Sequence, residues 1–348
     1  MYSTYLTLIV PALIAFLGAL GAIFFIQSYM VEAGIVFINL NPDARRRVML
    51  PTAGGIAVAF GFAIGTLAYV FGNSFGLYTA VASISLLFAA VLSVMLITFV
   101  GFLDELNIKA KMVHTTGMKD IRKGLKQWQK PIFTVIGAIP LVAVNAGVSM
   151  VMLPFFGAVN FGIIYPLVLL PLAIIFVANA FNLLGGFDGM ITGTGLIAAL
   201  GLLIYSLAFG TYSGALISAI LVAAVLPLFW YHKYPVKVLP GDSFTYGYGA
   251  AFLAAAVIGS MEAFAMIVFL PWIIEFFLHL RGKFKTTDLG KPQKDGTLAP
   301  PYGKKIYSWT HIIMNIKPMR EWEVSAYMWV IETIFVVLAF GLKVAGLL

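Results

Sequence analysis

Long stretches without a charged residue constrain the fold of this chain more than any other feature. Asp, Glu, Lys and Arg are absent from residues 1–31, 48–103, 131–187 and 189–232. A helix that crosses a lipid bilayer needs about 20 apolar residues, so the first stretch is long enough for one span and each of the others for two. Charged residues make up 10% of the chain and hydrophobic residues 61%, against roughly 25% and 45–50% in soluble domains. We therefore predict an integral membrane protein. The composition excludes a soluble enzyme, a disordered chain and a nucleic-acid-binding protein.

Two further segments extend this pattern. Residues 243–280 and 324–348 contain only two charged residues each, and the first of them divides at Gly259-Ser260. Together with breaks near the middle of the three long stretches, this predicts an all-α polytopic membrane protein with about ten transmembrane helices. We expect one membrane domain over residues 1–348, in which 281–322 forms a cytoplasmic loop. No Lys or Arg precedes the first apolar run, so we expect a retained helix there and not a cleaved signal peptide.

The basic residues test this topology independently. If each long uncharged stretch forms a helical hairpin, all charged loops lie on one side of the membrane. Of the 22 Lys and Arg residues, only Lys343 lies outside these loops. Because Lys and Arg concentrate in cytoplasmic loops, we expect these loops in the cytoplasm and both termini on the extracytoplasmic side. The same placement, with contacts to anionic membrane lipids, explains the net charge of +8 without a nucleic-acid partner.

Four acidic residues are more informative, because the rule for basic loops does not require them. Asp104, Glu105, Asp188 and Asp242 each lie at the cytoplasmic end of a predicted span, in three different loops. Ionisable groups at membrane depth are costly and indicate a functional site. For any one of them alone, helix capping or interfacial solvation is the alternative. Four in the same layer favour a shared site on the cytoplasmic face.

The neighbours of these acids indicate the chemistry of that site. Asn179 and Asn182 are three residues apart, hence on one helix face, and a glycine-rich break separates them from Asp188. The segment 51–55 opens a span with Gly54-Gly55, where free helix N-terminal amides favour an anion. Carboxylate and amide oxygens, in a chain without cysteine or paired histidines, indicate Mg²⁺ or Mn²⁺ and not Zn²⁺. We therefore predict a metal–phosphate site at the membrane surface.

Five motifs in this order resemble the polyprenyl-phosphate N-acetylhexosamine-1-phosphate transferases, glycosyltransferase family 4. The resemblance covers nearly the whole chain and is closer to the dolichyl-phosphate N-acetylglucosamine phosphotransferase and its archaeal relatives than to the peptidoglycan enzymes. The motifs are Pro51 to Gly55, Gly101 to Glu105, Asn179 to Met190, Gly241 to Tyr246 and Lys317 to Glu321.

The resemblance implies roles for individual residues. Asn182 and Asp242 match the positions that hold Mg²⁺, and Asp104 and Glu105 match the family's paired aspartates, which we take as catalytic with Lys130. Lys130 matches the lysine that meets the lipid phosphate, with Lys126 beside it. The predicted contacts of the nucleotide sugar are Asp188, Asn179, Gly54, Gly55, Asp43, Arg281 and His279.

The chain also departs from the family pattern. Glu105 stands where the family has a second aspartate, Thr52 where the dolichyl branch tends to have glutamate, and Gly185 where the bacterial enzymes have aspartate. The histidine-rich loop of the peptidoglycan enzyme is missing, which argues against that substrate.

The other ionisable groups receive simpler interpretations. We expect Glu275 near the membrane interface. We expect the histidines to be solvated residues on the cytoplasmic side, with His279 a plausible substrate contact. They are His114, His232, His279 and His311.

The reaction implied by the resemblance transfers N-acetylglucosamine-1-phosphate from UDP-GlcNAc to a polyprenyl (dolichyl) phosphate, giving GlcNAc-diphospho-lipid and UMP. This is the first membrane step of lipid-linked oligosaccharide synthesis. Direct attack by the lipid phosphate is favoured over a phospho-enzyme formed on Asp104. Other UDP-HexNAc donors or undecaprenyl phosphate remain alternatives, as does an endoplasmic-reticulum membrane in place of an archaeal cell membrane, and a homodimer is left open. A cation-coupled secondary transporter is disfavoured, because transporter sites lie near the bilayer midplane and these acids lie at span ends.

Overall fold

The computed structural model describes residues 2–33, 36–38, 49–78, 80–106, 125, 128–153 and 157–348. About 71% of the chain is helical. The predicted site residues Asp43 and Lys126 lie outside the described residues, as does His114.

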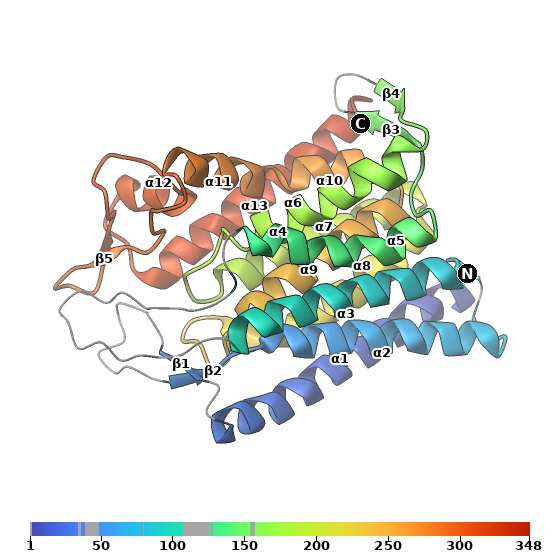
Figure 1. The fold of residues 1–348 in the computed structure, drawn as a ribbon, viewed down its shortest axis with the longest axis horizontal. Helices are drawn as coiled ribbons and strands as arrows, with labels where there is room; N and C mark the ends of the chain where they lie inside the picture. Colours follow the sequence, from blue (N-terminus) through green and yellow to red (C-terminus); the bar gives the residue numbers. More distant parts are fainter. Residues whose placement is uncertain are drawn as a thin grey trace.

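Six helices in the described part of the chain are long and apolar enough to cross a membrane. Figure 1 shows them side by side in one bundle. They are α1 (Tyr2–Glu32), α2 (Gly54–Ser74), α3 (Ile84–Leu106), α7 (Met190–Phe209), α8 (Tyr212–His232) and α13 (Glu321–Val344). Their length and composition support a polytopic integral membrane protein.

The remaining predicted spans are shorter, more polar or bent. Residues 129–143 form α4 (Gln129–Thr134), a 3₁₀ turn η1 (Val135–Ala138) and α5 (Ile139–Ala143). Residues 165–181 form a π-helical turn η2 (Tyr165–Leu169) and α6 (Leu170–Phe181), and α9 spans Gly241–Ile258. The helices α10 (Glu262–Val268) and α11 (Leu270–Arg281) meet at a 53° bend and count as a seventh span if taken together. The number of ten crossings stays a prediction.

Proline explains the bend between α10 and α11. Pro271 lies in the first turn of α11, where a proline has no N–H to give to the preceding helix and its ring clashes with the backbone one turn earlier. The chain therefore changes direction at Phe269-Leu270 and cannot continue as one straight helix.

The all-α prediction holds for the bulk of the chain but missed three antiparallel hairpins. β1 (Val36–Ile38) pairs with β2 (Met49–Pro51), β3 (Met150–Leu153) with β4 (Gly157–Asn160), and β5 (Lys291–Pro292) with β6 (Leu298–Ala299). A short helix, α12 (Trp309–Ile316), follows β6. Short strands of two to four residues leave little hydrophobic pattern for a prediction.

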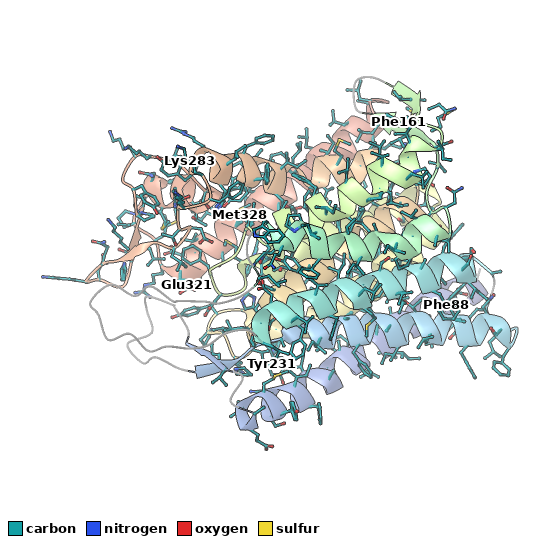
Figure 2. The ribbon with its side chains drawn as sticks, in the orientation of Figure 1. Phe88, Phe161, Tyr231, Lys283, Glu321 and Met328 are labelled. Carbon is teal, nitrogen blue, oxygen red and sulfur yellow. The ribbon has the colours of Figure 1, made fainter. Side chains whose placement is uncertain are left out.

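The two ends of the bundle differ. Figure 1 shows β1, β2, β5 and α12 toward one end, and β3, β4 and both chain termini toward the other. Figure 2 shows Glu321 and Lys283 at the first of these ends and Phe88 and Phe161 at the other. Both termini therefore share an end, opposite the described charged segment 281–320, which contains β5 and α12. Which side of a membrane that end faces stays a prediction.

Small residues bring α9 into the middle of the bundle. Every residue from 243 to 258 is buried. A Cβ on Gly247 would lie 2.1 Å from Oγ1 of Thr98 on α3, and a Cβ on Gly249 would lie 2.7 Å from Cα of Ala178 on α6. Glycines let membrane helices approach this closely, so α9 packs directly against both neighbours.

Aromatic stacking fixes α6, α9 and α11 relative to one another. The ring of Phe181 stacks on Tyr248 at 4.3 Å and on Trp272 at 5.0 Å between centroids, and Phe181 also meets the edge of Phe244 at 6.0 Å. Offset and edge contacts of this kind stabilise packing beyond the area they bury. The C-terminal end of α6 therefore lies beside the first turn of α9.

We predict that Gly249→Ala destabilises the protein by about 1–3 kcal/mol, because the added methyl group meets the backbone of α6 and overpacked cores cost that much. The matched control is Gly341→Ala on α13, where nothing lies within 4 Å of the new Cβ; alanine should be neutral or slightly stabilising there. Thermal unfolding of both variants in detergent measures the difference. Equal melting temperatures would show that α9 and α6 are not in tight contact.

Candidate active site

A lysine shared by two aspartates lies where three helices meet. Lys130 Nζ on α4 is 2.7 Å from Asp104 Oδ2 at the end of α3 and 3.5 Å from Asp242 Oδ2 in the first turn of α9. The other carboxylate oxygen of Asp104 accepts the backbone N–H of Leu125. The side chain of Asp104 is 3% exposed, against 23% for Lys130 and 24% for Asp242. Asp104 is thus the buried member of this group, and Lys130 and Asp242 are partly exposed to solvent.

Two glycines make this junction sterically possible. A Cβ on Gly101 would fall 2.4 Å from the carbonyl oxygen of Asp242, and one on Gly241 would fall 2.3 Å from Oε1 of Glu105. Gly241 also has a φ of +71°, a conformation that glycine adopts at little cost. The predicted motifs 101–105 and 241–246 therefore pack directly against each other.

Glu105 ties three segments together behind the lysine. Its Oε1 accepts the backbone N–H of Ser243 at 2.7 Å, and its Oε2 accepts the hydroxyl of Thr52 at 2.8 Å. Glu105 is 4% exposed and Thr52 is 2% exposed. Two apparent departures from the family pattern, Glu105 and Thr52, are thus partners in one buried hydrogen bond. Both carboxylate oxygens of Glu105 are engaged by the protein itself.

Gly54 and Gly55 serve packing at the start of α2. The amide of Gly54 donates to the carbonyl of Leu239 at 3.1 Å, and that of Gly55 to the carbonyl of Pro240 at 3.0 Å. A Cβ on Gly55 would lie 1.9 Å from the backbone nitrogen of Phe244. These two amides are therefore not free to bind an anion, which corrects the expectation from the sequence. The glycines are needed because α9 begins in contact with them.

The two asparagines occupy the end of α6. The side-chain amide of Asn179 donates to Thr134 Oγ1 at 3.1 Å and to the carbonyl of Ile175 at 2.8 Å, which links α6 to α4 one turn beyond Lys130. Asn182 is the C-terminal cap residue of α6 and is partly buried. The Phe181–Phe244 contact places this cap next to the first turn of α9, which contains Asp242.

Asp188 joins three segments of the polar layer. Its Oδ2 accepts the backbone N–H of Val236 at 3.0 Å, and its own N–H donates to Glu321 Oε1 at 2.9 Å. Its carbonyl accepts the hydroxyl of Ser325 at 2.8 Å. Asp188 is 5% exposed. The Lys317–Glu321 motif thus docks the start of α13 onto the α6–α7 connection, a contact that no feature of the sequence indicated.

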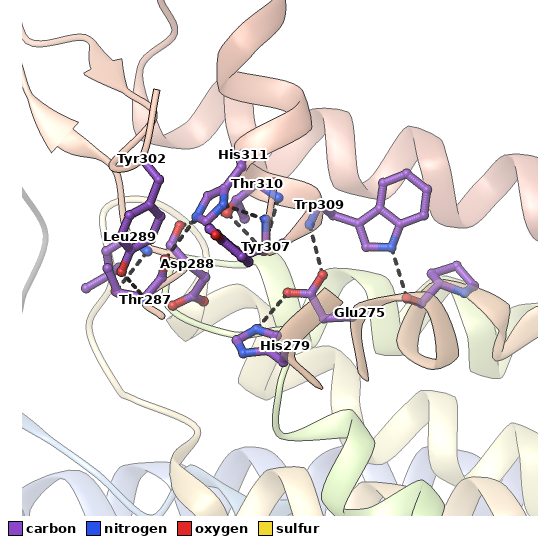
Figure 3. Close-up of polar contacts among 12 residues, drawn as sticks. Glu275, His279, Thr287, Asp288, Leu289, Tyr302, Tyr307, Trp309, Thr310 and His311 are labelled. Carbon is purple, nitrogen blue, oxygen red and sulfur yellow. Dashed lines mark hydrogen bonds and ion pairs between the residues drawn. The ribbon is translucent and has the colours of Figure 1, made fainter. Parts of the chain in front are cut away.

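The segment after α11 folds back and buries a second polar cluster, drawn in Figure 3. Glu275 Oε1 lies 3.1 Å from His279 Nε2, and its Oε2 accepts the backbone N–H of Trp309 at 2.9 Å. The Nδ1 of His311 accepts the N–H of Tyr307 at 3.0 Å, so its Nε2 donates to the carbonyl of Thr287 at 2.9 Å as a neutral ring.

The described histidines are buried, so the expectation of solvated histidines was wrong. His311 is 0% exposed, His232 4% and His279 8%. Glu275, expected near the interface, is fully buried. The returning segment supplies both hydrogen-bond partners of His311. His279 pairs instead with Glu275 on its own helix, and His232 with Thr192 on α7. Arg281 stays exposed with its guanidinium 5.7 Å from the ring of Tyr307.

Asp288 is a carboxylate near the site that sequence reasoning missed. A Cβ on Gly186 would lie 2.7 Å from Asp288 Oδ2, so this side chain faces the glycine turn that follows Asn182. Gly185, in the same turn, stands where the resemblance places a bacterial aspartate. A carboxylate therefore does approach this turn, but from a segment about a hundred residues further along the chain. No local pattern could connect the two.

The donor set suits a metal held only partly by protein. Within the described residues, no group of three or more His, Asp or Glu side chains gathers to hold an ion. Asp242 and Asn182 offer one partly exposed carboxylate and one amide oxygen at neighbouring helix ends. Mg²⁺ typically takes one or two protein carboxylates and completes its octahedron with water and substrate phosphate. The residues present fit that mode and do not form a closed cage.

We predict that Thr52→Val destabilises the protein by about 1–3 kcal/mol, because it removes the hydroxyl donor from a buried carboxylate oxygen. Thr66→Val on α2, the helix that follows Thr52, is the control, since its hydroxyl bonds only the carbonyl of Phe62 one turn back. Chemical or thermal unfolding should separate the two variants. Equal losses of stability in the two variants would mean that the hydrogen bond from Thr52 does not stabilise the buried carboxylate of Glu105.

The stability of the 282–308 segment should depend on pH. Burial raises the pKa of Asp288 to about 7, and the Glu275 carboxylate adds to this. Between about pH 4 and 7 the folded chain then binds more protons at this group than the unfolded chain, so its contribution lowers the free energy of unfolding as pH rises. Asp288→Asn should raise stability at pH 8, by at most about 4 kcal/mol for a shift of about three pKa units, with the gap closing toward pH 5.

Asp295 provides a control of opposite sign in the same segment. Hydrogen bonds from the side chain and backbone of Thr297 hold the pKa of Asp295 below its ordinary value. Its contribution is present at neutral pH and is lost as pH falls through that lowered value. Asp295→Asn should therefore be slightly less stable than wild type at pH 7. If the melting temperatures of wild type and Asp288→Asn change in parallel with pH, the raised pKa of Asp288 is contradicted.

Comparison with known proteins confirms the resemblance. The sequence profile of glycosyl transferase family 4 matches residues 87–260, which contain Asp104, Lys130 and Asp242. A protein of Saccharolobus solfataricus, provisionally named UDP-N-acetylglucosamine–dolichyl-phosphate N-acetylglucosaminephosphotransferase, is 30% identical over 97% of this chain and 97% of its own length. A Sulfolobus acidocaldarius protein with the same provisional name is 30% identical over 83% of each chain. The phospho-N-acetylmuramoyl-pentapeptide-transferase of Halalkalibacterium halodurans is 27% identical over 84% of this chain and 83% of its own. The family profile covers Lys130 and the two aspartates around it, and the Saccharolobus relative aligns along nearly the whole chain. This integral membrane protein therefore belongs to glycosyl transferase family 4.

Proposed function

We propose that this protein transfers N-acetylglucosamine-1-phosphate from UDP-GlcNAc to a polyprenyl (dolichyl) phosphate and releases UMP. The names of the two archaeal relatives support this choice of substrates. The observation that carries the proposal is the half-open pair of Lys130 and Asp242 at helix ends. A cation and an anion side by side there suit a phosphate acceptor and a metal-bound diphosphate donor.

The chemistry exchanges one phosphoanhydride for another, so the main obstacle is the repulsion between two anionic substrates. Positioning and charge neutralisation therefore carry most of the catalysis. Lys130 would hold the acceptor phosphate in line, with Asp104 fixing the ammonium from behind. A phosphate monoester with a second pKa near 6 is mostly dianionic at pH 7, and needs little help from a general base.

The surroundings of Asp104 support direct attack over a phospho-enzyme. One carboxylate oxygen is paired with Lys130 and the other accepts a backbone N–H. A side chain that is 3% exposed and engaged at both oxygens is a poor nucleophile. Detection of a covalent phospho-sugar on the protein after mixing with UDP-GlcNAc alone would overturn this part of the proposal.

Asn182 and Asp242 are the residues that would hold Mg²⁺, with Mn²⁺ as the alternative. Such an ion, when bound, neutralises the donor diphosphate and the UMP leaving group. Asp242 would turn its partly exposed carboxylate toward such an ion, while Glu105 fixes the start of α9 through the amide of Ser243. Asp188 and Asn179 act in this scheme by holding the connections around the donor.

We also place the protein in an archaeal cell membrane, with the charged loops in the cytoplasm. The archaeal sources of the two relatives support this choice. The loops would then face cytoplasmic nucleotide sugars.

The test incubates purified protein with Mg²⁺, dolichyl phosphate and a panel of UDP-sugars, and measures UMP. We expect release with UDP-GlcNAc that is abolished by EDTA and reduced by at least about 10²-fold in Asp242→Asn, the scale seen when one charge-stabilising group is lost. Asp295→Asn, on the exposed segment, should retain wild-type activity. Absence of UMP with every donor would refute the proposed function, and release with a different UDP-HexNAc alone would change the donor.

A further inference from the structure

A buried tyrosine hydroxyl without a partner lies beside the lysine of the candidate site. Tyr246 is 0% exposed, and its hydroxyl has no hydrogen-bond partner among the described residues. Burying a hydroxyl without a partner costs roughly 1–3 kcal/mol. Most buried hydroxyls are paired for that reason, so this one needs an explanation.

The position of Tyr246 connects it to Lys130. Tyr246 follows Asp242 by four residues on α9, so both side chains lie on one face of the helix. Lys130 Nζ is 5.9 Å from the centroid of the Tyr246 ring. Because the tyrosine is closed off from solvent, a substrate cannot reach its hydroxyl directly. The lysine ammonium, on a flexible stem, is a hydrogen-bond donor next to it that can move.

The ammonium also has a donor to spare. A lysine ammonium has three N–H groups, and the described contacts are a short one to Asp104 at 2.7 Å and a long one to Asp242 at 3.5 Å. Asp242 is the more exposed of the two aspartates and is the one that faces the donor under the proposed function. When Asp242 turns to the donor, its long contact with Lys130 is the one that gives way.

We propose that Tyr246 is a positioning residue for the lipid-phosphate acceptor: its hydroxyl accepts a hydrogen bond from Lys130 when the acceptor phosphate is bound. The bond replaces the contact with Asp242 and holds the ammonium between Asp104 and Tyr246, with its third N–H aimed at the acceptor phosphate. This inference rests on the proposed function, because it assumes that Lys130 meets that phosphate.

This assignment has an energetic consequence that an ordinary structural tyrosine would not have. In the substrate-free enzyme the unpartnered hydroxyl is a cost, so its removal should leave the protein as stable as wild type or slightly more stable. In the enzyme with the acceptor phosphate bound the hydroxyl is paired, so its removal should reduce the stabilisation that the acceptor gives and raise the KM for the acceptor. Stability kept below its optimum for the sake of function is a common trade-off.

The test compares Tyr246→Phe with Tyr248→Phe. Tyr248 is the matched control, because it is buried on the same helix but its hydroxyl already donates to the carbonyl of Gly195 at 2.5 Å. Melting temperatures are measured in nanodiscs with and without dolichyl phosphate, and KM is measured separately for dolichyl phosphate and UDP-GlcNAc. The two variants remove the same atom from the same helix, so a general packing defect would affect both.

For Tyr246→Phe we expect an unchanged or higher melting temperature without dolichyl phosphate. Adding dolichyl phosphate should raise the melting temperature of this variant less than that of wild type. The KM for dolichyl phosphate should rise by about tenfold, the value of one hydrogen bond to a charged group. The KM for UDP-GlcNAc should stay within about twofold of wild type. For Tyr248→Phe we expect the reverse: a lower melting temperature and an unchanged KM for dolichyl phosphate. In a Lys130→Ala background, adding Tyr246→Phe should not weaken the dolichyl phosphate response further, because the hydroxyl acts through the lysine.

The outcomes separate this inference from the proposed function. If wild type responds to dolichyl phosphate and Tyr246→Phe responds equally, Tyr246 has no positioning role and the proposed function is untouched. If Tyr246→Phe loses stability without lipid phosphate and keeps its KM, the tyrosine is only structural. If wild type neither responds to dolichyl phosphate nor releases UMP, the proposed function fails and this inference fails with it.

Discussion

The polar layer of this protein depends on one lysine held between two aspartates. Lys130 lies partly buried where α3, α4 and α9 meet, and Asp104 and Asp242 supply anionic partners for its ammonium. Asp104 is buried, and removing one partner of a buried ion pair costs roughly 3–5 kcal/mol, so its contact with Lys130 holds the end of α3 to the start of α4. The unequal exposure of the three side chains then divides their roles. Asp104 is anchored inside, whereas Lys130 and Asp242 remain open to solvent.

Around this centre, backbone groups at helix ends are paired with buried side chains. Glu105 accepts the amide of Ser243 at the start of α9 and the hydroxyl of Thr52 at the start of α2. Asp188 accepts the amide of Val236 after α8, and Glu321 at the start of α13 accepts the amide of Asp188 before α7. An unpaired polar group is costly in an environment of low dielectric constant, so these ties hold the bundle together and place the open residues at the same time.

Physical reasoning from the sequence located the centre of the site but misjudged its surroundings. Charges at membrane depth are costly wherever they occur, so Asp104 and Asp242 could be recognised from their place at span ends alone. Thr52 and Glu105 looked like two independent departures from a family pattern, although they are hydrogen-bonded partners. The histidines were expected to be solvated because they fall in segments predicted to lie on the cytoplasmic side, but the segment after α11 returns and covers His279 and His311.

The sequence by itself determined that the chain is embedded in a membrane and which family it belongs to. These properties are sums over windows of about 20 residues or strings of adjacent residues, so they need no knowledge of the fold. Only the tertiary structure decided which donor meets which carboxylate, that the amides of Gly54 and Gly55 are occupied, and that Asp288 faces the turn at Gly186. Those pairings join residues tens to more than a hundred positions apart, and they form only because glycine-mediated helix contacts and the bend between α10 and α11 bring the segments together.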